Sequence, residues 1–187
     1  MPWKNGVNMA GNDYNDKQKA EFTDNINSLD LNPDQKKYLI SRWLDQVFWM
    51  EDKAKTFQER YHFLRVVAIT GGVLVPALGA FSRDCPLAQG GVVIVGILVA
   101  LAMALEEFFK NGERWRHYRR IIEALKKEWW MYYELCAGYA GKDHVAGFSE
   151  FAGKVEDILA ADVDVFLTKV TADTKPKTPT EEGKGGN

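Results

Sequence analysis

The sequence has only two cysteines, Cys85 and Cys136, and three histidines, His62, His117 and His144, among its 187 residues. Neither set has the spacing of a metal site, and two cysteines do not make a disulfide framework. A metal shared by His62 and His117 stays open as an alternative, although isolated histidines are usually surface or core residues. The sequence also lacks a nucleophile motif and a phosphate-binding loop. We therefore expect no enzyme activity, no cofactor and no metal.

The chain also lacks an excess of charge of either sign. Its 24 basic and 26 acidic residues leave a formal net charge of −2, which argues against nucleic-acid binding. The charges are unevenly distributed, however. Residues 66–82 and 85–105 carry no charged side chain, whereas the rest of the chain is rich in Lys, Arg, Asp and Glu.

The two uncharged windows have the length of membrane-spanning helices. They contain 17 and 21 residues, or roughly 26 and 32 Å of helix, against a hydrocarbon core of about 30 Å. The first window becomes long enough when Leu64 and the aliphatic part of Arg65 are included. Residues 1–31 form a polar segment without the apolar core of a signal peptide. We predict two membrane helices in the mature protein, at about 65–82 and 87–107.

Only Arg83 and Asp84 separate the two windows, so the spans are expected to be antiparallel neighbours. The segments that flank the hairpin are basic, and the positive-inside rule places such segments in the cytoplasm. We expect a multi-pass protein of the plasma (inner) membrane with both termini cytoplasmic, which places Cys85 and Cys136 on opposite sides. The basic flanking residues are Lys53, Lys55, Arg60, Arg65, Lys110, Arg114, Arg116, Arg119, Arg120, Lys126 and Lys127.

Pro76 lies in the middle of the first span. In a helix it removes the hydrogen bond to the carbonyl of Gly72 and crowds that carbonyl, which predicts a kink. Gly71 and Gly72, one turn earlier, leave room for the backbone to bend, and a gating hinge is one interpretation. The alternative is that Gly71, Gly72 and Pro76 let two helices pack closely.

The second span has a small residue at every fourth position: Gly96, Ala100 and Ala104. Such a stripe lets the backbones of two membrane helices approach each other. It predicts a tight contact, either with the first span or with another subunit.

Long helices are predicted to continue from both spans. Asn32, Pro33 and Gln35 have the pattern of a helix start, with a capping side chain followed by proline. Two heptad seams predict stalk helices over 33–64 and 108–137 that pack as an antiparallel cytoplasmic coiled coil. We expect the second helix to end near Gly138 and Gly141. The seams are Trp43, Val47, Met50, Ala54, Phe57, Tyr61 and Leu64, and Trp115, Tyr118, Ile122, Leu125, Trp129, Tyr132 and Cys136.

Aromatic residues at helical spacing are usually core residues, so at least one of Trp129 and Trp130 should be buried in the stalk or at a subunit contact. A C-terminal helix is predicted over 148–170, where one face is apolar, and it should fold back on the stalk. Residues 171–187 have no apolar residue other than alanine and are predicted to be disordered. Residues 32–170 thus form one helical domain of an all-α membrane protein.

Three segments in order around the hairpin, 42–78, 113–139 and 148–160, resemble the bacterial domain-of-unknown-function family 4231, in the SLATT group of two-transmembrane proteins. The first contains Leu64-Arg65 followed by GGVLVPAL, and the second ends in Gly138-Tyr139. The resemblance covers roughly residues 40–165. It implies a membrane protein without known enzymatic activity, and relatives are proposed to be pore-forming effectors in bacterial conflict systems. The stalk residues that fit the family motif are Trp115, Tyr118, Arg119, Glu123, Leu125, Lys126 and Glu128.

Two classes of function remain. A channel or pore needs a homo-oligomer, because one hairpin cannot enclose a water path; Glu106 and Glu107, at the cytoplasmic end of the second span, would then form a ring that favours cations. These acids could instead be solvated or pair with Lys110 and Arg114. The other class is a membrane-anchored scaffold whose stalk recruits a separate regulatory or signalling protein. The bilayer is a partner in both cases, and nucleic acid in neither.

Overall fold

The computed structural model describes residues 3–81 and 86–173, with the side chains of residues 14–80 and 89–161. No strand occurs within these ranges, which confirms the all-α class. The predicted turn at Arg83 and Asp84, and the tail beyond Asp173, lie outside the described residues. The elements are α1 (Trp3–Ser28), α2 (Pro33–Tyr38), the π-helical segment η1 (Leu39–Leu44), α3 (Asp45–Phe81), α4 (Pro86–Phe109), α5 (Asn111–Tyr133), the 3₁₀ turn η2 (Ala137–Tyr139) and α6 (His144–Asp173).

The predicted helix start at Asn32 is confirmed. Its side chain accepts a hydrogen bond of 2.8 Å from the backbone N–H of Gln35, and the Gln35 side chain accepts one of 3.1 Å from the backbone N–H of Asn32. This reciprocal arrangement is a capping box. From here α2, η1 and α3 follow one another directly as far as Phe81.

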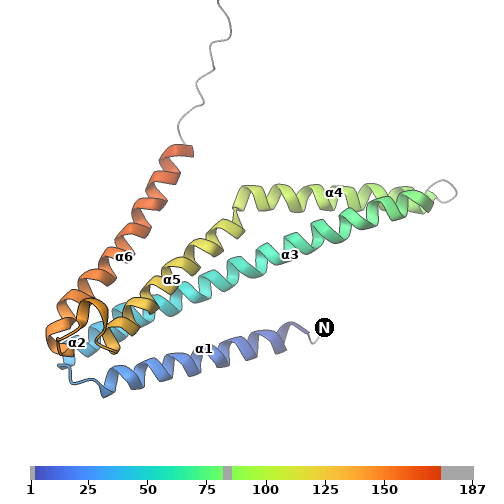
Figure 1. Cartoon of the computed structure of the whole chain (residues 1–187). Coiled ribbons are helices and arrows are strands. Elements are labelled where there is room, and N and C mark those ends of the chain that lie inside the picture. Colours follow the sequence, from blue (N-terminus) through green and yellow to red (C-terminus); the bar gives the residue numbers. More distant parts are fainter. Residues whose placement is uncertain (1–2, 82–85, 174–187) are drawn as a thin grey trace, which may run out of the picture.

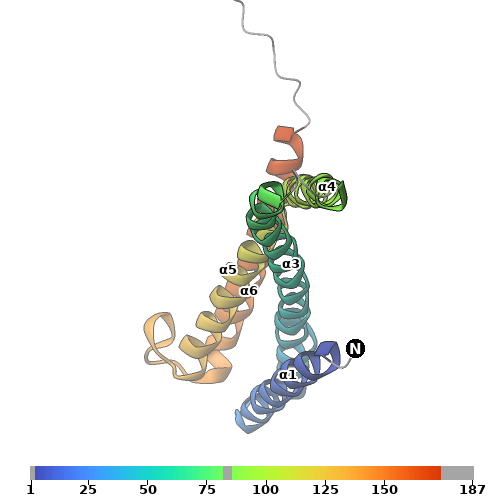
Figure 2. The same ribbon diagram turned by 90° about the vertical axis from the view of Figure 1, so that its right-hand side faces the viewer.

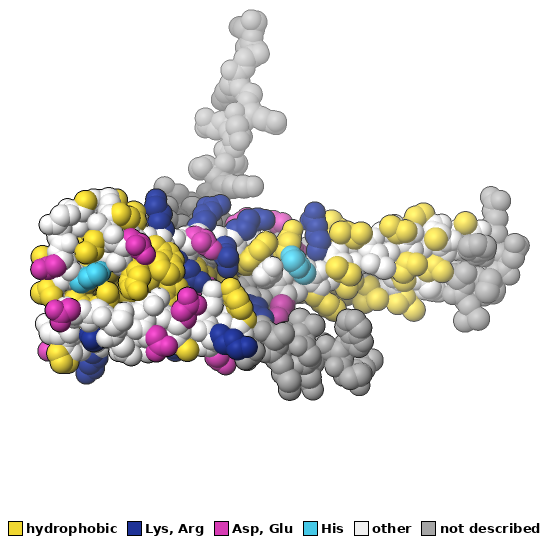
Figure 3. Space-filling model, turned by 60° about the horizontal axis from the view of Figure 1, so that its bottom comes forward, with side chains coloured by type: hydrophobic (Ala, Val, Ile, Leu, Met, Phe, Trp, Pro, Cys, Tyr) yellow, Lys and Arg dark blue, Asp and Glu magenta, His cyan; other side chains and the backbone are white. Residues whose placement is uncertain are grey.

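Helices α3 and α4 lie side by side as a hairpin (Figure 1). Both are long and apolar enough to cross a membrane, and only 6% of the most apolar stretch of each is buried. A core helix of a soluble protein buries most of such a stretch, so these side chains need lipid or another chain around them. On the face in Figure 3, charged side chains gather on the rest of the molecule and leave the hairpin hydrophobic. The fold is that of a helical membrane protein.

The stalk helix predicted over 108–137 needs a correction at its beginning. Helix α4 ends at Phe109, Lys110 has a left-handed conformation with φ 49°, and α5 begins at Asn111. We call this junction, residues 106–112, the elbow. Helix α5 turns away from the direction of α4 here and runs along α3 (Figure 1).

The end of that helix also differs from the prediction. Helix α5 ends at Tyr133, before Gly138 and Gly141. Leu135 takes the left-handed position with φ 49°, its N–H donates to Tyr132 O (3.2 Å), and Cys136 N–H donates to Met131 O (3.0 Å). These two bonds form a Schellman motif, in which glycine is usual at the position of Leu135. The helix therefore ends without the glycine on which the prediction relied.

The C-terminal helix begins earlier than predicted. Asp143 caps it, because its carboxylate accepts a hydrogen bond of 2.6 Å from the backbone N–H of Ala146. Phe151 and Val155 are fully buried against the stalk, so the predicted return of this helix is confirmed for its first half. Farther along, α6 leaves the other helices, and α1 diverges in another direction (Figures 1 and 2).

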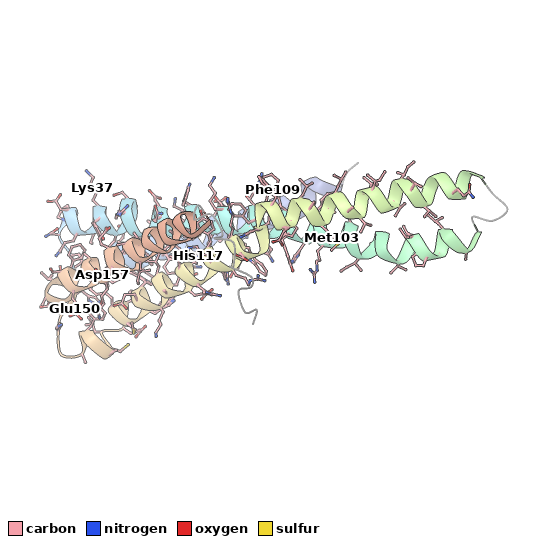
Figure 4. All side chains as sticks on the ribbon, turned by 90° about the horizontal axis from the view of Figure 1, so that it is seen from above. Lys37, Met103, Phe109, His117, Glu150 and Asp157 are labelled. Atoms are coloured by element: carbon pink, nitrogen blue, oxygen red, sulfur yellow. The ribbon has the colours of Figure 1, made fainter. Side chains whose placement is uncertain are left out.

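The hydrophobic core lies at the end of the stalk away from the hairpin. It joins α1, η1, the start of α3, the end of α5 and the start of α6. Charged side chains surround this end, including the labelled Lys37, Glu150 and Asp157, whereas the labelled Met103 lies in the hairpin (Figure 4). Seam residues are buried at this end and half-buried toward the membrane; Cys136, beyond the end of α5, is exposed.

Candidate functional site: the elbow and the stalk

The elbow is held by the carboxylate of Glu106. One oxygen accepts a hydrogen bond of 3.0 Å from the backbone N–H of Gly112, and the other accepts one of 3.2 Å from the Asn111 side chain. The Glu106 carbonyl accepts the N–H of Lys110 (2.8 Å). A left-handed residue other than glycine costs about 1–2 kcal/mol, so these bonds offset the strain at Lys110. The bond from Gly112 also satisfies one of the backbone donors that the first turn of α5 leaves free.

This arrangement bears on the predicted cation ring. The carboxylate of Glu106 is engaged within its own chain, and its partners are Asn111 and Gly112 rather than the Lys110 and Arg114 considered above. Glu107 is exposed. The ring stays a prediction, and Glu107 is the residue better placed to serve it.

The elbow also contacts α3 directly. A Cβ atom at Gly112 would lie 2.8 Å from Cε2 of Tyr61, so only glycine fits without movement of the Tyr61 ring or of one helix. The Tyr61 ring is stacked on Trp115 at 6.3 Å between centroids, and Asn111 is only 3% exposed. Movement of α5 relative to α3 must therefore disturb this contact.

Within the hairpin, Gly71 has the close-packing role that was one of its two interpretations. A Cβ atom there would lie 2.3 Å from Cγ2 of Val99 on α4. Gly72 has no such neighbour within 4 Å. Pro76 lies inside α3, which continues to Phe81, and the kink and hinge stay predictions.

The small-residue stripe of the second span does not face the first span. Gly96 has no described neighbour within 4 Å of its Cβ position, and Ala100 and Ala104 are exposed. Helix α4 instead turns Val95 and Val99 toward Gly71. Of the two predicted partners for the stripe, α3 is therefore excluded within this chain.

Each stalk residue that the sequence singled out has a defined neighbour. Tyr118 is stacked on Phe57 of α3, with 5.8 Å between centroids and 7° between planes. Arg119 forms an exposed ion pair of 2.8 Å with Glu123, one helical turn away, and such pairs contribute little to stability. Together with Trp115, these residues place aromatic and basic groups along the part of α5 next to the hairpin.

Lys126 forms the ion pair that joins α5 to α3. Its Nζ atom lies 2.6 Å from Oε1 of Glu51, and the two side chains are only 17% and 11% exposed. Removing one member of a poorly solvated pair leaves the other charge uncompensated. This cross-helix pair therefore helps to fix the register of the two stalk helices.

A groove of about 270 Å³ opens beside this pair, between the middle of α1, α3 and α5. Three of the predicted motif residues, Trp115, Arg119 and Lys126, contribute to its lining. The sequence motif thus corresponds to one place in the fold. The full lining is Tyr14, Asn15, Gln18, Glu51, Ala54, Lys55, Gln58, Trp115, Arg119 and Lys126.

Aromatic rings dominate the core at the far end of the stalk. Trp129 is fully buried and stacked on Trp43 at 4.6 Å, while Trp130 is 43% exposed, which confirms that at least one of this pair is buried. Phe22 of α1 contacts both Trp43 and Trp129 edge-on, at 5.6 and 6.3 Å. Within the described part of the chain, the indole N–H of Trp129 has no hydrogen-bond partner. The indole N–H of Trp43, by contrast, donates to the carbonyl oxygen of Leu125 (3.4 Å). The rings therefore contribute close packing to this core.

Sequence reasoning missed the part that α1 plays in this core. Residues 1–31 were described only as polar, yet Phe22, Ile26, Leu29 and Leu31 are buried. A signal was present, because Phe22, Ile26 and Leu29 follow at steps of four and three. This apolar spacing was overlooked because most of the neighbouring residues in the sequence are polar.

Tyr139 closes the core through a polar network around the buried Glu128. Its hydroxyl donates to the Glu128 carboxylate (2.5 Å), which also lies 3.3 Å from Nζ of Lys154. Burial raises the pKa of Tyr139 well above its usual value, and the Glu128 hydrogen bond raises it further. A Cβ atom at Gly138 would lie 2.9 Å from Nζ of Lys154. The Gly-Tyr pair of the family motif therefore joins α5 to α6.

A second polar group ties α2 and η1 to α6. Two nitrogens of the Arg42 guanidinium donate to the two carboxylate oxygens of Glu156, at 2.8 and 2.7 Å, and the Tyr38 hydroxyl donates to the same carboxylate at 2.9 Å. The Arg42 hydrogen bonds lower the pKa of Glu156. Burial, followed by the bond to Glu156, raises the pKa of Tyr38.

The histidines occupy three separate surroundings. His62 lies against Trp115 (5.9 Å), His117 against Tyr118 (6.2 Å), and Nε2 of His144 lies 3.1 Å from the Tyr133 carbonyl oxygen. Among the described residues, no group of three or more His, Cys, Asp or Glu side chains is arranged to hold a metal ion. Cys85 lies outside the described residues.

Comparison with known proteins places this architecture in a family. Residues 45–146 match the family described as "Protein of unknown function (DUF4231)", from the start of α3 to the first turn of α6. No curated protein and no solved structure matches the chain. The matched range is narrower than the resemblance over 40–165, but it covers more than half of the 187 residues. The chain therefore belongs to the DUF4231 family.

Proposed function

We propose that this chain is one subunit of a homo-oligomeric channel of the plasma (inner) membrane, with both termini cytoplasmic and a preference for cations. The observation that carries the proposal is the open face of α4. Gly96, Ala100 and Ala104 are turned away from α3, and small residues at this spacing suit the close approach of another membrane helix. A second copy supplies such a helix, and several copies are needed to surround a water path.

The proposed channel opens through its stalk and involves no catalysis. Because the described spans carry no charged side chain between residues 66 and 80 or 89 and 105, their lining is a hydrophobic constriction that conducts only when wetted. The elbow couples this region to α5, since Glu106 holds Gly112 and Gly112 touches Tyr61. Displacement of α5 by a separate regulatory or signalling protein is thus transmitted to the end of α4.

The test is ion flux through liposomes that contain the full-length protein. We expect a cation-selective conductance, and we expect Glu107→Gln to shift the reversal potential under a salt gradient toward that of a non-selective pore. Glu59→Gln is the matched control, because Glu59 is an exposed acid on α3 outside the charge-free window. Absence of conductance at any voltage, or equal shifts in the two variants, would contradict the proposal.

The alternative is a membrane-anchored scaffold, which two exposed tryptophans favour. Trp49 and Trp130 are 48% and 43% exposed on the stalk, and exposed indole rings are common centres of protein interfaces. Particle imaging in detergent separates the two functions. A symmetric ring with an open axis supports the channel, whereas single copies, or an axis filled by side chains, support the scaffold.

A further inference from the structure

Two arginines on α5, Arg116 and Arg120, are exposed and form no ion pair within the described residues. Their basic neighbours on the same helix are engaged. Arg119 pairs with Glu123 at 2.8 Å, and the guanidinium carbon of Arg114 lies 5.6 Å from the centroid of the Phe57 ring. Arg116 and Arg120 are thus the arginines of this region that are free to bind something outside the chain.

The position of these arginines is close to the membrane surface. Phe108 and Phe109, at the end of α4, are 80% and 47% exposed and touch each other edge-on at 5.1 Å; Figure 4 labels Phe109 at this junction. These apolar rings are followed directly by the charged Lys110, which indicates that the hydrocarbon region ends near this point. Arg116 follows Asn111, the first residue of α5, by five residues, or about 8 Å of helix, and the headgroup layer is roughly 5–7 Å thick.

The direction of α5 brings the arginine side chains nearer to the lipid. Side chains of an α-helix lean toward its N-terminus, and the N-terminus of α5 is the end that meets the hairpin. Arg116 therefore leans back toward the headgroups, and Arg120 does so from one turn farther away. On α3 the spans lie at the C-terminal end, so a basic residue such as Arg60 leans away from the membrane.

The surface around these arginines is hollowed. A shallow depression of about 380 Å³ is lined by Trp115, Arg116, Arg119, Arg120 and Glu123, and the surface that it presents is mainly apolar. The guanidinium group presents paired N–H donors that match two oxygens of a phosphate. An anionic headgroup is complementary in charge and in hydrogen bonding to the guanidinium groups of Arg116 and Arg120, which are exposed at the edge of this depression.

We propose that Arg116 and Arg120 bind the phosphate of an anionic phospholipid in the leaflet on the stalk side of the membrane. The proposal rests on the membrane position of the hairpin, which the proposed function shares, but it is independent of conduction. Arg116 makes the larger contribution, because it lies nearer to the headgroups. Bound lipid then holds α5 next to the elbow.

The experiment compares lipid association with the full-length protein in phosphatidylcholine vesicles. Trace amounts of spin-labelled phosphatidylglycerol or phosphatidylcholine report the relative association constant by electron spin resonance. A basic residue near a membrane surface changes the affinity for anionic lipid by about fivefold. We therefore expect Arg116→Gln to lower the preference for phosphatidylglycerol by up to about fivefold and Arg120→Gln by less, whereas Arg116→Lys keeps most of it.

The matched control is Arg60→Gln, which removes the same charge at a similar distance from the span, about 9 Å along α3. This variant should leave the lipid preference unchanged. Equal losses in Arg60→Gln and Arg116→Gln would show a diffuse surface charge and overturn the proposal, as would an unchanged preference in Arg116→Gln. Competition by millimolar inorganic phosphate would also overturn it, because the site would then take free anions. None of these readouts depends on ion flux, so failure here is distinct from failure of the channel.

Discussion

Replacing Gly112 by alanine should separate the elbow from α3. The new Cβ atom would lie 2.8 and 2.9 Å from two carbons of the Tyr61 ring, well inside the usual contact distance. Overpacking of this kind costs about 1–3 kcal/mol, while removal of a helical glycine returns up to about 1 kcal/mol. We expect a net loss of about 1–2 kcal/mol, because Gly112 lies in the first turn, where helix propensity counts least. For a chain of this length, that loss lowers the Tm by about 2–8 °C.

The assay is thermal unfolding in detergent, followed by tryptophan fluorescence. The cause is tested by a double-mutant cycle with Tyr61, because removing the ring removes the obstacle. In a Tyr61→Ala background, Gly112→Ala should no longer destabilise the protein, whereas in a Tyr61→Phe background, which keeps the contacting carbons, the loss should persist.

The control is Gly153→Ala on α6, where a Cβ atom has no neighbour within 4 Å. It should be neutral or slightly stabilising. If Gly112→Ala behaves like Gly153→Ala, or if Tyr61→Ala does not rescue it, the elbow does not pack on α3 as described.

Three further outcomes are expected. Gly71→Ala should destabilise the hairpin by about 1–3 kcal/mol in the same assay, with rescue by Val99→Ala, because the new Cβ atom would lie 2.3 Å from Val99. The Arg42 hydrogen bonds lower the folded-state pKa of Glu156, so their contribution to stability is complete above the unfolded pKa and is lost as the pH falls through the folded one. The Tm should therefore fall as the pH drops below the ordinary pKa of a glutamate, and Glu156→Gln should flatten this slope. Cys136 is exposed on the stalk. In a variant that lacks the other cysteine, a membrane-impermeant maleimide should label Cys136 in inverted vesicles and not in intact cells. Labelling in intact cells alone would contradict cytoplasmic termini.

The heptad seams were predictable because they depend only on residue type and spacing. Trp43, Val47, Leu125 and Trp129 are buried where the two seams meet, and steps of three and four are sufficient to indicate this. The absence of charged side chains from residues 66–82 and 85–105 likewise predicted the two long apolar helices. These features require no knowledge of how distant parts of the chain meet.

The elbow was missed although the sequence carries a signal for it: Asn111-Gly112, a dipeptide typical of turns, directly follows Lys110. What the sequence does not show is that Lys110 itself takes the left-handed conformation, because that position is usually occupied by glycine or asparagine. The strain at Lys110 is offset by bonds from Glu106, whose carboxylate the sequence suggested only as part of a charged ring. The Glu51–Lys126 pair was equally hidden, since it depends on the register of two helices.

The two legs of this hairpin differ mechanically. From Asp45 to Phe81 one leg is a continuous helix that contains Pro76, while the other is divided at Lys110. A lateral displacement of the far end of the stalk should consequently tilt all of α3, including its apolar segment. The same displacement of α5 can be accommodated by bending at the elbow, which leaves most of α4 in place. The apolar segments of α3 and α4 should then shift relative to each other, and the close contact between Gly71 and Val99 is where this shift would change the packing.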